Sequence, residues 1–233
     1  MERIKWDVPD PGHFETDLVH HSGSSSAGTY IHTLQLVDVA TGWSERVAVL
    51  GRNQEAMEGG FRRVVERLPF RITHLHPDNG SEFFNDHLIR FWGEAITGLS
   101  LSRSRPYHKS DNRCVEQKND TLVRAYLGTE RLNTAVQCDA LIALYDHMWT
   151  YYNLFQPVLH LVSKDIVDGT LRRRWDTVAT PYERLLRTGV LDHAPTERLA
   201  TLHAETNHRQ LRRSIYQPIP RMWDLPADAR RVA

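Results

Sequence analysis

Three strand-like segments before the first helical segment are the feature that most limits how this chain can fold. Residues 14–21, 29–39 and 43–50 have the apolar and β-branched pattern of strands. The turn sequence Ala-Thr-Gly at 40–42 separates the last two. Short connections of this kind join antiparallel neighbours. The first fifty residues therefore predict an antiparallel meander.

Helical and strand-like segments then alternate. Asn53 is a good N-cap, and apolar residues recur behind it at helical spacing until Pro69. A strand over 71–77, a helix around 88–95 and a short strand over 99–102 follow. Strands separated by helices pair in parallel, so these two strands should extend the meander.

Two more helices complete this part of the chain. One has Val115, Leu122 and Tyr126 on a face, and the other starts at a capping box, Thr134 to Gln137, and should bury Val136 and later apolar residues. The order βββαβαβαα resembles the ribonuclease-H-like layered fold. We expect an α/β fold whose five-stranded mixed sheet is flanked by helices.

Beyond residue 157 the pattern changes. Asp168-Gly169 between two strand-like segments predicts a hairpin over 159–176. A capping box at Thr180 predicts a short helix ending at Gly189, and residues 195–213 look helical. We expect a catalytic core over 8–157 and a small C-terminal hairpin-plus-helix appendage over 158–233.

Composition favours a cytoplasmic, nucleoid-associated protein. The 233 residues contain no apolar stretch long enough to span a bilayer, the N-terminal segment is not signal-like, and the two cysteines are too few for a disulfide framework. Formal net charge is zero, but residues 103–131 hold seven Lys or Arg against four Asp or Glu. The second half should therefore carry any phosphate-binding surface.

Three carboxylates on separate elements are the candidate catalytic residues. Asp17 lies within a strand, where burying a carboxylate is costly without a cation or a donor. Asp78 follows the fourth strand, and Glu116 starts a helix whose side chains can face the sheet. Such a set is a hard-oxygen site suited to Mg²⁺ or Mn²⁺. Taken singly, each could instead be a turn residue, an ion-pair partner or a helix-dipole partner.

Three sequence blocks in order carry a family resemblance: Glu-Thr-Asp at 15–17, HPDNGSEF at 76–83 and SRPYHKSDNRCVEQKN at 104–119. Together they resemble the DDE catalytic core of bacterial insertion-sequence transposases and retroviral integrases. The resemblance covers roughly residues 8 to 157. It implies that Asp17, Asp78 and Glu116 bind two Mg²⁺ or Mn²⁺ ions, which hold the scissile phosphate for strand cleavage and transfer. Asn79, Gly80 and Asn119 match the surrounding pattern, and Tyr107 and His108 would lie on an active-site loop.

DNA is the expected partner, as element ends and as target, with the protein acting as a homo-oligomer on it. The candidate DNA-binding residues come from the family pattern and from the basic segments of the chain. They are Arg105, Tyr107, His108, Lys109, Lys118, Asn119, Arg172 and Arg174. In the hairpin, Arg172 and Arg174 would share one strand face while Leu171 and Trp175 pack inward.

The sequence departs from the family in two respects. Asp78 and Glu116 are separated by 37 residues, slightly more than usual for the family, and only sixteen residues precede Asp17, where many relatives carry a helix-turn-helix or zinc-binding domain. We therefore expect a possible separately encoded helix-turn-helix partner. The alternative is a truncated, transposition-inactive fragment that only binds DNA or a partner.

Two other motifs offer competing interpretations. His74 and His76 followed by Asp78 resemble metal ligands of an amidohydrolase, although that class needs a longer β/α barrel with further ligands. The glycine- and serine-rich segment 23–29 mimics a phosphate-binding loop, but it has no lysine and precedes a strand. We interpret it as a hairpin loop.

Overall fold

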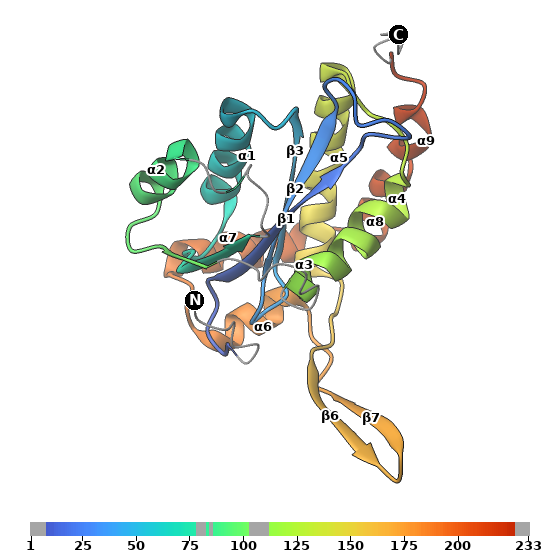
Figure 1. The fold of residues 1–233 in the computed structure, drawn as a ribbon. Helices are drawn as coiled ribbons and strands as arrows, with labels where there is room; N and C mark the ends of the chain where they lie inside the picture. The colour runs from blue at the N-terminus through green and yellow to red at the C-terminus, as the bar shows by residue number, and fades with distance from the viewer. Residues whose placement is uncertain (1–7, 78–82, 84–85, 103–111, 227–233) are drawn as a thin grey trace.

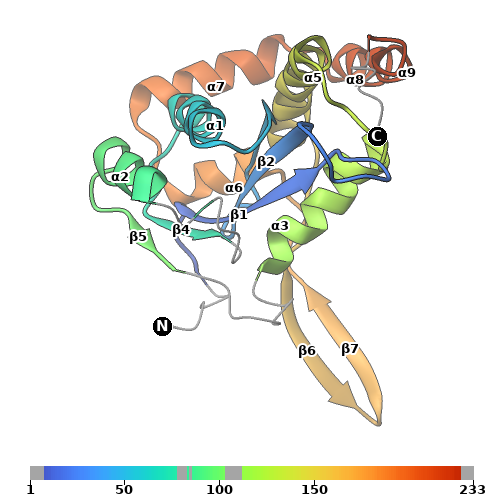
Figure 2. The same ribbon diagram turned by 45° about the horizontal axis from the view of Figure 1, so that its top comes forward.

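The computed structural model describes residues 8–77, 83, 86–102 and 112–226. Its main feature is a five-stranded sheet with the order β3-β2-β1-β4-β5 (Figures 1 and 2). The three antiparallel strands are β1 (His13–His20), β2 (Ile31–Asp38) and β3 (Ser44–Leu50). On the other side of β1 lie two parallel strands, β4 (His74–Pro77) and β5 (Ser100–Leu101). This mixed sheet, with the first strand in the centre, is the ribonuclease-H-like arrangement that the sequence predicted.

One face of the sheet is covered by α1 (Gln54–Arg67) and α2 (Asp86–Ala95). The predicted cap of α1 is present, because the Asn53 side chain accepts a hydrogen bond from the Ala56 N–H at 2.8 Å. Phe14 and Leu18 of β1 point into this hydrophobic cluster. Strand alternation therefore turns Glu15, Asp17 and Val19 toward the opposite face.

The opposite face is covered by a helical segment in three parts and by one long helix. The parts are α3 (Arg113–Lys118), the π-helical η2 (Asn119–Arg124) and α4 (Ala125–Leu127), and the long helix is α5 (Ala135–Leu154). Their apolar side chains form a second cluster with Val19 and Ile31 of the sheet. The sheet is thus the middle layer between two helical layers (Figure 2).

Helix α5 begins at the predicted capping box, with Thr134 and Gln137 bonded to each other's backbone. The prediction that it buries Val136 was wrong, since 53% of that side chain is exposed. The buried stripe instead follows Gln137, Leu141 and Met148. At 100° per residue Val136 lies roughly 130° from the centre of this stripe, so it faces solvent.

A buried carboxylate connects β3 with α1 and α5. Glu45 of β3 accepts hydrogen bonds from the indole N–H groups of Trp43 at 2.9 Å and Trp149 of α5 at 2.6 Å. Its other oxygen accepts from Arg67 at the end of α1, at 2.7 Å. Arg67 also pairs with Asp146 of α5 at 2.9 Å. These bonds hold α1 and α5 against β3.

The predicted hairpin is formed by β6 (Leu161–Val167) and β7 (Thr170–Trp175), and it stands away from the body of the molecule (Figure 1). Asp168 and Gly169 both have left-handed backbone conformations, with φ of 51° and 75°, as a two-residue hairpin turn requires. The expected inward packing of Leu171 and Trp175 was wrong: they are 50% and 48% exposed. A two-stranded sheet that projects from the body has nothing against which both could pack.

Four helices follow the hairpin: α6 (Pro181–Thr188), α7 (His193–Glu205), α8 (His208–Tyr216) and α9 (Pro218–Met222). The helix expected over 195–213 is interrupted at Thr206-Asn207, where Asn207 caps α8 by accepting from two backbone N–H groups at 3.1 Å. Leu199 of α7 joins the cluster on the α1 side, and Ile215 of α8 joins the cluster on the α5 side. The division at residue 157 stays a prediction.

Candidate active site

The central strand β1 presents two acidic side chains to the face that α3 and η2 cover. Asp17 is half-buried, and its two carboxylate oxygens have different donors. Oδ1 accepts from the Leu18 N–H at 2.8 Å, and Oδ2 accepts from the side-chain amide of Asn119 at 2.7 Å. These bonds fix the orientation of the carboxylate.

The helical segment that carries Glu116 is attached to β1 at three points. The Val115 N–H donates to the Glu15 carboxylate at 2.8 Å, Asn119 donates to Asp17, and the Arg124 guanidinium donates to the carbonyl oxygen of His20 at 2.9 Å. Along the chain, four residues separate Val115 from Asn119 and five separate Asn119 from Arg124. A regular α-helix would not keep all three on one line, but the π-helical turn of η2 does.

Glu116 is exposed and lies between the first two attachment points. The structure therefore brings two of the three predicted carboxylates, Asp17 and Glu116, onto elements that are directly bonded to each other. Within the described residues, no group of three or more His, Cys, Asp or Glu side chains is placed to hold a metal ion.

The third predicted carboxylate, Asp78, lies outside the described residues. Pro77, the last residue of β4, pairs in register with Thr16, and Asp78 and Asp17 are the next residues in their respective chain segments. Six other predicted residues also lie outside the described ranges: Asn79, Gly80, Arg105, Tyr107, His108 and Lys109.

Glu15 is a functional candidate that sequence reasoning missed. It is fully buried, and burial raises the pKa of its carboxyl group to about 7, although hydrogen bonds from the Val115 and Cys114 backbone N–H groups act in the opposite direction. Its role is to attach the start of α3 to β1. The only signal in the sequence was its position two residues before Asp17, on the same strand face.

The remaining predicted residues are dispersed. Lys118 is half-buried, and burial, with a contribution from Arg46, lowers the pKa of its ammonium group to about 8. Arg172 and Arg174 are exposed on one face of β7, opposite Asp165 and Ser163. The structure places them on the projecting hairpin and not beside Asp17 (Figure 1).

The two histidines of the competing amidohydrolase interpretation are engaged within the sheet. His74 Nε2 and His76 Nδ1 lie 2.6 and 2.5 Å from the hydroxyl oxygen of Ser102, next to β5. The His74 ring also stacks on His13 at 4.0 Å between centroids. These contacts give both imidazoles a structural role.

The donor set fits a divalent cation of the Mg²⁺ class. Asp17 and Glu116 supply hard oxygen ligands, which Mg²⁺ prefers over nitrogen and sulfur. Asp17 is held by hydrogen-bond donors of its own, as metal-ligating carboxylates commonly are.

Comparisons with known proteins give one curated relative and a structural likeness. The chain is 37% identical over 179 residues to the uncharacterized protein y4rM of Sinorhizobium fredii (strain NBRC 101917 / NGR234), covering 77% of this chain and 51% of that protein. It thus spans about half the length of that relative. No protein-family model matches the chain.

Among solved structures, the catalytic core domain of BIV integrase aligns with 76% of this chain and 95% of its own, at a TM-score of 0.49 and 17% identity. The ribonuclease-H-like fold itself follows from the order and direction of the five strands. Across the described ranges, no helix has both the length and the hydropathy that a bilayer crossing requires.

Proposed function

We propose that this chain is the catalytic core of a DDE-type DNA transposase or integrase. It cleaves and joins phosphodiester strands with Asp17, Asp78 and Glu116. DNA, as element ends and as target, is its substrate. It acts as a homo-oligomer on that DNA.

The observation that carries this proposal is the attachment of the Glu116 helix to the strand that bears Asp17. Three bonds, from residues 115, 119 and 124, run along β1 beside the carboxylate. Polar bonds buried at a sheet face stabilise a fold less efficiently than apolar packing does, so their alignment along the strand that bears Asp17 favours a functional role. The blocks around Asp78 and Tyr107 support the same activity by resemblance.

The chain's own residues orient the reacting groups. The Leu18 N–H and the Asn119 amide hold the Asp17 carboxylate in one orientation, and Glu15 holds the start of α3, the helix of Glu116, against β1. Asp17, Asp78 and Glu116 would hold two Mg²⁺ or Mn²⁺ ions. When bound, such ions lower the pKa of an attacking water or 3′-hydroxyl and stabilise the leaving oxygen.

A strand-joining assay tests the proposal. Labelled duplex DNA with free 3′-hydroxyl ends is incubated with supercoiled plasmid and Mg²⁺ or Mn²⁺, and nicked and joined products are measured. The wild type should act only with the metal. Asp17→Asn, Asp78→Asn and Glu116→Gln should each reduce the rate about a hundredfold or more, because each removes charge stabilisation at the reacting phosphate.

Asp120→Asn is the matched control for Glu116→Gln. Asp120 is an exposed carboxylate one turn further along the same helical segment, and its removal should leave the rate unchanged. Full activity of Glu116→Gln would contradict the triad. Tight DNA binding by a wild type that joins no strands would instead favour the truncated, binding-only alternative.

A further inference from the structure

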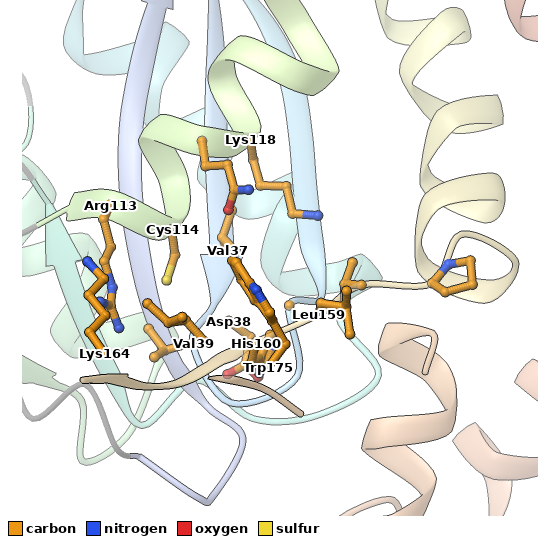
Figure 3. Close-up of a pocket in the computed structure, with 15 residues that line it drawn as sticks. Val37, Asp38, Val39, Arg113, Cys114, Lys118, Leu159, His160, Lys164 and Trp175 are labelled. Atoms are coloured by element: carbon orange, nitrogen blue, oxygen red, sulfur yellow. The ribbon is translucent and has the colours of Figure 1, made fainter. Parts of the chain in front are cut away.

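A cavity lies between the core and the base of the hairpin. It has a volume of about 590 Å³ and is lined by the end of β2, by α3 and by residues 157–164 and Trp175 of the hairpin segment (Figure 3). These segments are far apart in the sequence. The volume is within the range of pockets that hold small organic ligands.

The cavity has an excess of positive charge. Arg113 and Lys118 reach it from α3, and Lys164 reaches it from β6. Within the described part of the chain, the side chains of Lys118 and Lys164 form no ion pair or hydrogen bond with another residue. The acidic group in the lining is Asp38, whose two oxygens already accept hydrogen bonds from Gly12 and Thr41.

The positive charge affects the pKa of a histidine in the cavity, His160. Burial lowers the pKa of His160, and the cations Arg184, Lys118 and Arg113 lower it further, against the opposing effect of Asp176. His160 is therefore a neutral ring in a positive surrounding at pH 7. Such a surrounding favours an anionic ligand.

The rest of the lining is suited to a planar apolar group. Val37, Val39 and Val158 line the cavity, and the half-exposed indole of Trp175 lies at the same site. In Figure 3, the side chains of Arg113 and Cys114 point from α3 toward the hairpin segment with His160 and Trp175. A ligand with an anion at one end and a flat ring at the other matches both parts.

We propose that this cavity holds one unpaired nucleotide of the DNA strand under reaction, with its phosphate at the lysines and Arg113 and its base against Trp175. The inference rests on the proposed function and deepens it. A base inside a duplex is stacked on both faces, so only a nucleotide outside the stack can enter. The helix that lines the cavity, α3, also carries Glu116.

The test is fluorescence anisotropy with two fluorescein-labelled duplexes that differ only in a three-nucleotide single-stranded overhang. The wild type should bind the overhang duplex about tenfold more tightly than the blunt duplex, the order of one base-aromatic stacking interaction. Trp175→Ala should abolish this preference, and Trp175→Phe should keep most of it. Lys164→Gln should weaken binding of the overhang duplex more than that of the blunt duplex.

Trp223→Ala is the matched control. Trp223 is an indole of similar exposure at the end of α9, remote from the hairpin, so its removal should leave the preference intact. Thermal melting shows whether each variant is folded. The inference would be overturned if a folded Trp175→Ala variant kept the preference for the overhang duplex. It would also be overturned if free dAMP displaced the overhang duplex with an affinity equal to that of the duplex itself.

Two results with the wild type separate this inference from the proposed function. Equal affinity for blunt and overhang duplexes, together with metal-dependent strand joining, would overturn the nucleotide site and leave the function standing. Failure to bind any DNA would overturn both.

Discussion

At the scale of single residues, Asn119 determines how Asp17 can act. Its amide group donates to one carboxylate oxygen while the Leu18 N–H donates to the other. Partners of this kind hold a metal-ligating carboxylate in a fixed direction, and their loss commonly costs tenfold or more in metal affinity. Asn119 is buried, so its contribution is to position Asp17.

We predict that Asn119→Ala lowers the affinity for Mg²⁺ by about tenfold, because Asp17 loses the donor that orients it. Isothermal titration calorimetry with MgCl₂ measures the effect. Gln117→Ala, which removes an exposed amide from the same helical segment, should leave the affinity unchanged. Equal Mg²⁺ affinity in wild type and Asn119→Ala would show that the hydrogen bond has no part in metal binding.

Part of this site could be predicted from the sequence and part could not. Asp17 and Glu116 stand in recognisable local blocks, and the structure places both on elements that contact each other. Glu15 stands in the same block as Asp17, but nothing local predicts its contact with α3. Its burial depends on the helix that crosses β1 one hundred residues later in the chain, and a local pattern contains no information about that contact.

At the scale of elements, Glu45 is the residue that joins strand and helices. It is fully buried, and it accepts from Trp43, Trp149 and Arg67 at once. A buried carboxylate with all its donors in place is tolerated, but removing its charge leaves the Arg67 guanidinium with only its half-exposed partner, Asp146.

We predict that Glu45→Gln lowers the free energy of unfolding by about 3 kcal/mol, since the charge of Arg67 loses its buried partner. Urea denaturation at pH 7 measures the change. Glu130→Gln, an exposed carboxylate before α5, should alter stability by less than about 0.5 kcal/mol. If both variants unfold at the same urea concentration as the wild type, the three-element connection is not stabilising.

The hairpin carries a prediction about DNA affinity that rests on the proposed function. Arg172 and Arg174 are exposed on one face of β7, two residues apart. Replacing both by Ala should reduce the salt slope of DNA binding by roughly two units, because each phosphate contact contributes about 0.9. Anisotropy titrations at several KCl concentrations give the slope.

Arg173→Ala is the control for this pair, since Arg173 lies on the other strand face, paired with Lys164. An unchanged slope in a folded double variant would mean that Arg172 and Arg174 only solvate the hairpin. The phosphate contacts would then lie on other basic residues, Lys118 among them.

Element boundaries were predictable where local chemistry sets them. The caps at Asn53, Thr134 and Thr180, and the turn at Asp168-Gly169, follow from side chains within four residues. The exposure of Leu171 and Trp175 did not follow, because it depends on the hairpin standing away from the body. The interruption between α7 and α8 also escaped, since both helices have apolar residues that pack on different clusters.

At the scale of the whole molecule, His13, His21 and His32, in or next to the sheet, are neutral at pH 7 because their pKa values are lowered. Burial lowers the pKa of His13 and of His32 to about 4 and that of His21 to about 3, with Arg124 adding to the effect at His21. Each folded pKa lies below the ordinary value of about 6.5. As the pH falls, the unfolded chain takes up these protons first, so stability is full above pH 6.5 and is lost below it.

We predict that His21→Gln flattens this pH dependence. His21 alone should cost the wild type about 2 kcal/mol of unfolding free energy between pH 7 and pH 5, and the variant should lose this part of the decline. Urea denaturation at pH 7, 6 and 5 measures the difference. His147→Gln, at an exposed position on α5, should follow the wild type. Parallel curves for wild type and His21→Gln would contradict the assignment.

The π-helical turn of η2 sets a rotational phase between the two halves of one helical segment. Adding or deleting one residue in a helix turns everything before it by roughly 100° about the axis. Deleting Thr121 would let the turn relax to ordinary α geometry with a four-residue step, which keeps Glu116 facing β1, whereas inserting a further residue would rotate Glu116 away from β1 while α4 stayed in place. The number of residues between Val115 and Arg124 is therefore a constraint in its own right, separate from their identities: substitutions on the exposed side and the loss of one residue can be absorbed, but a further added residue cannot.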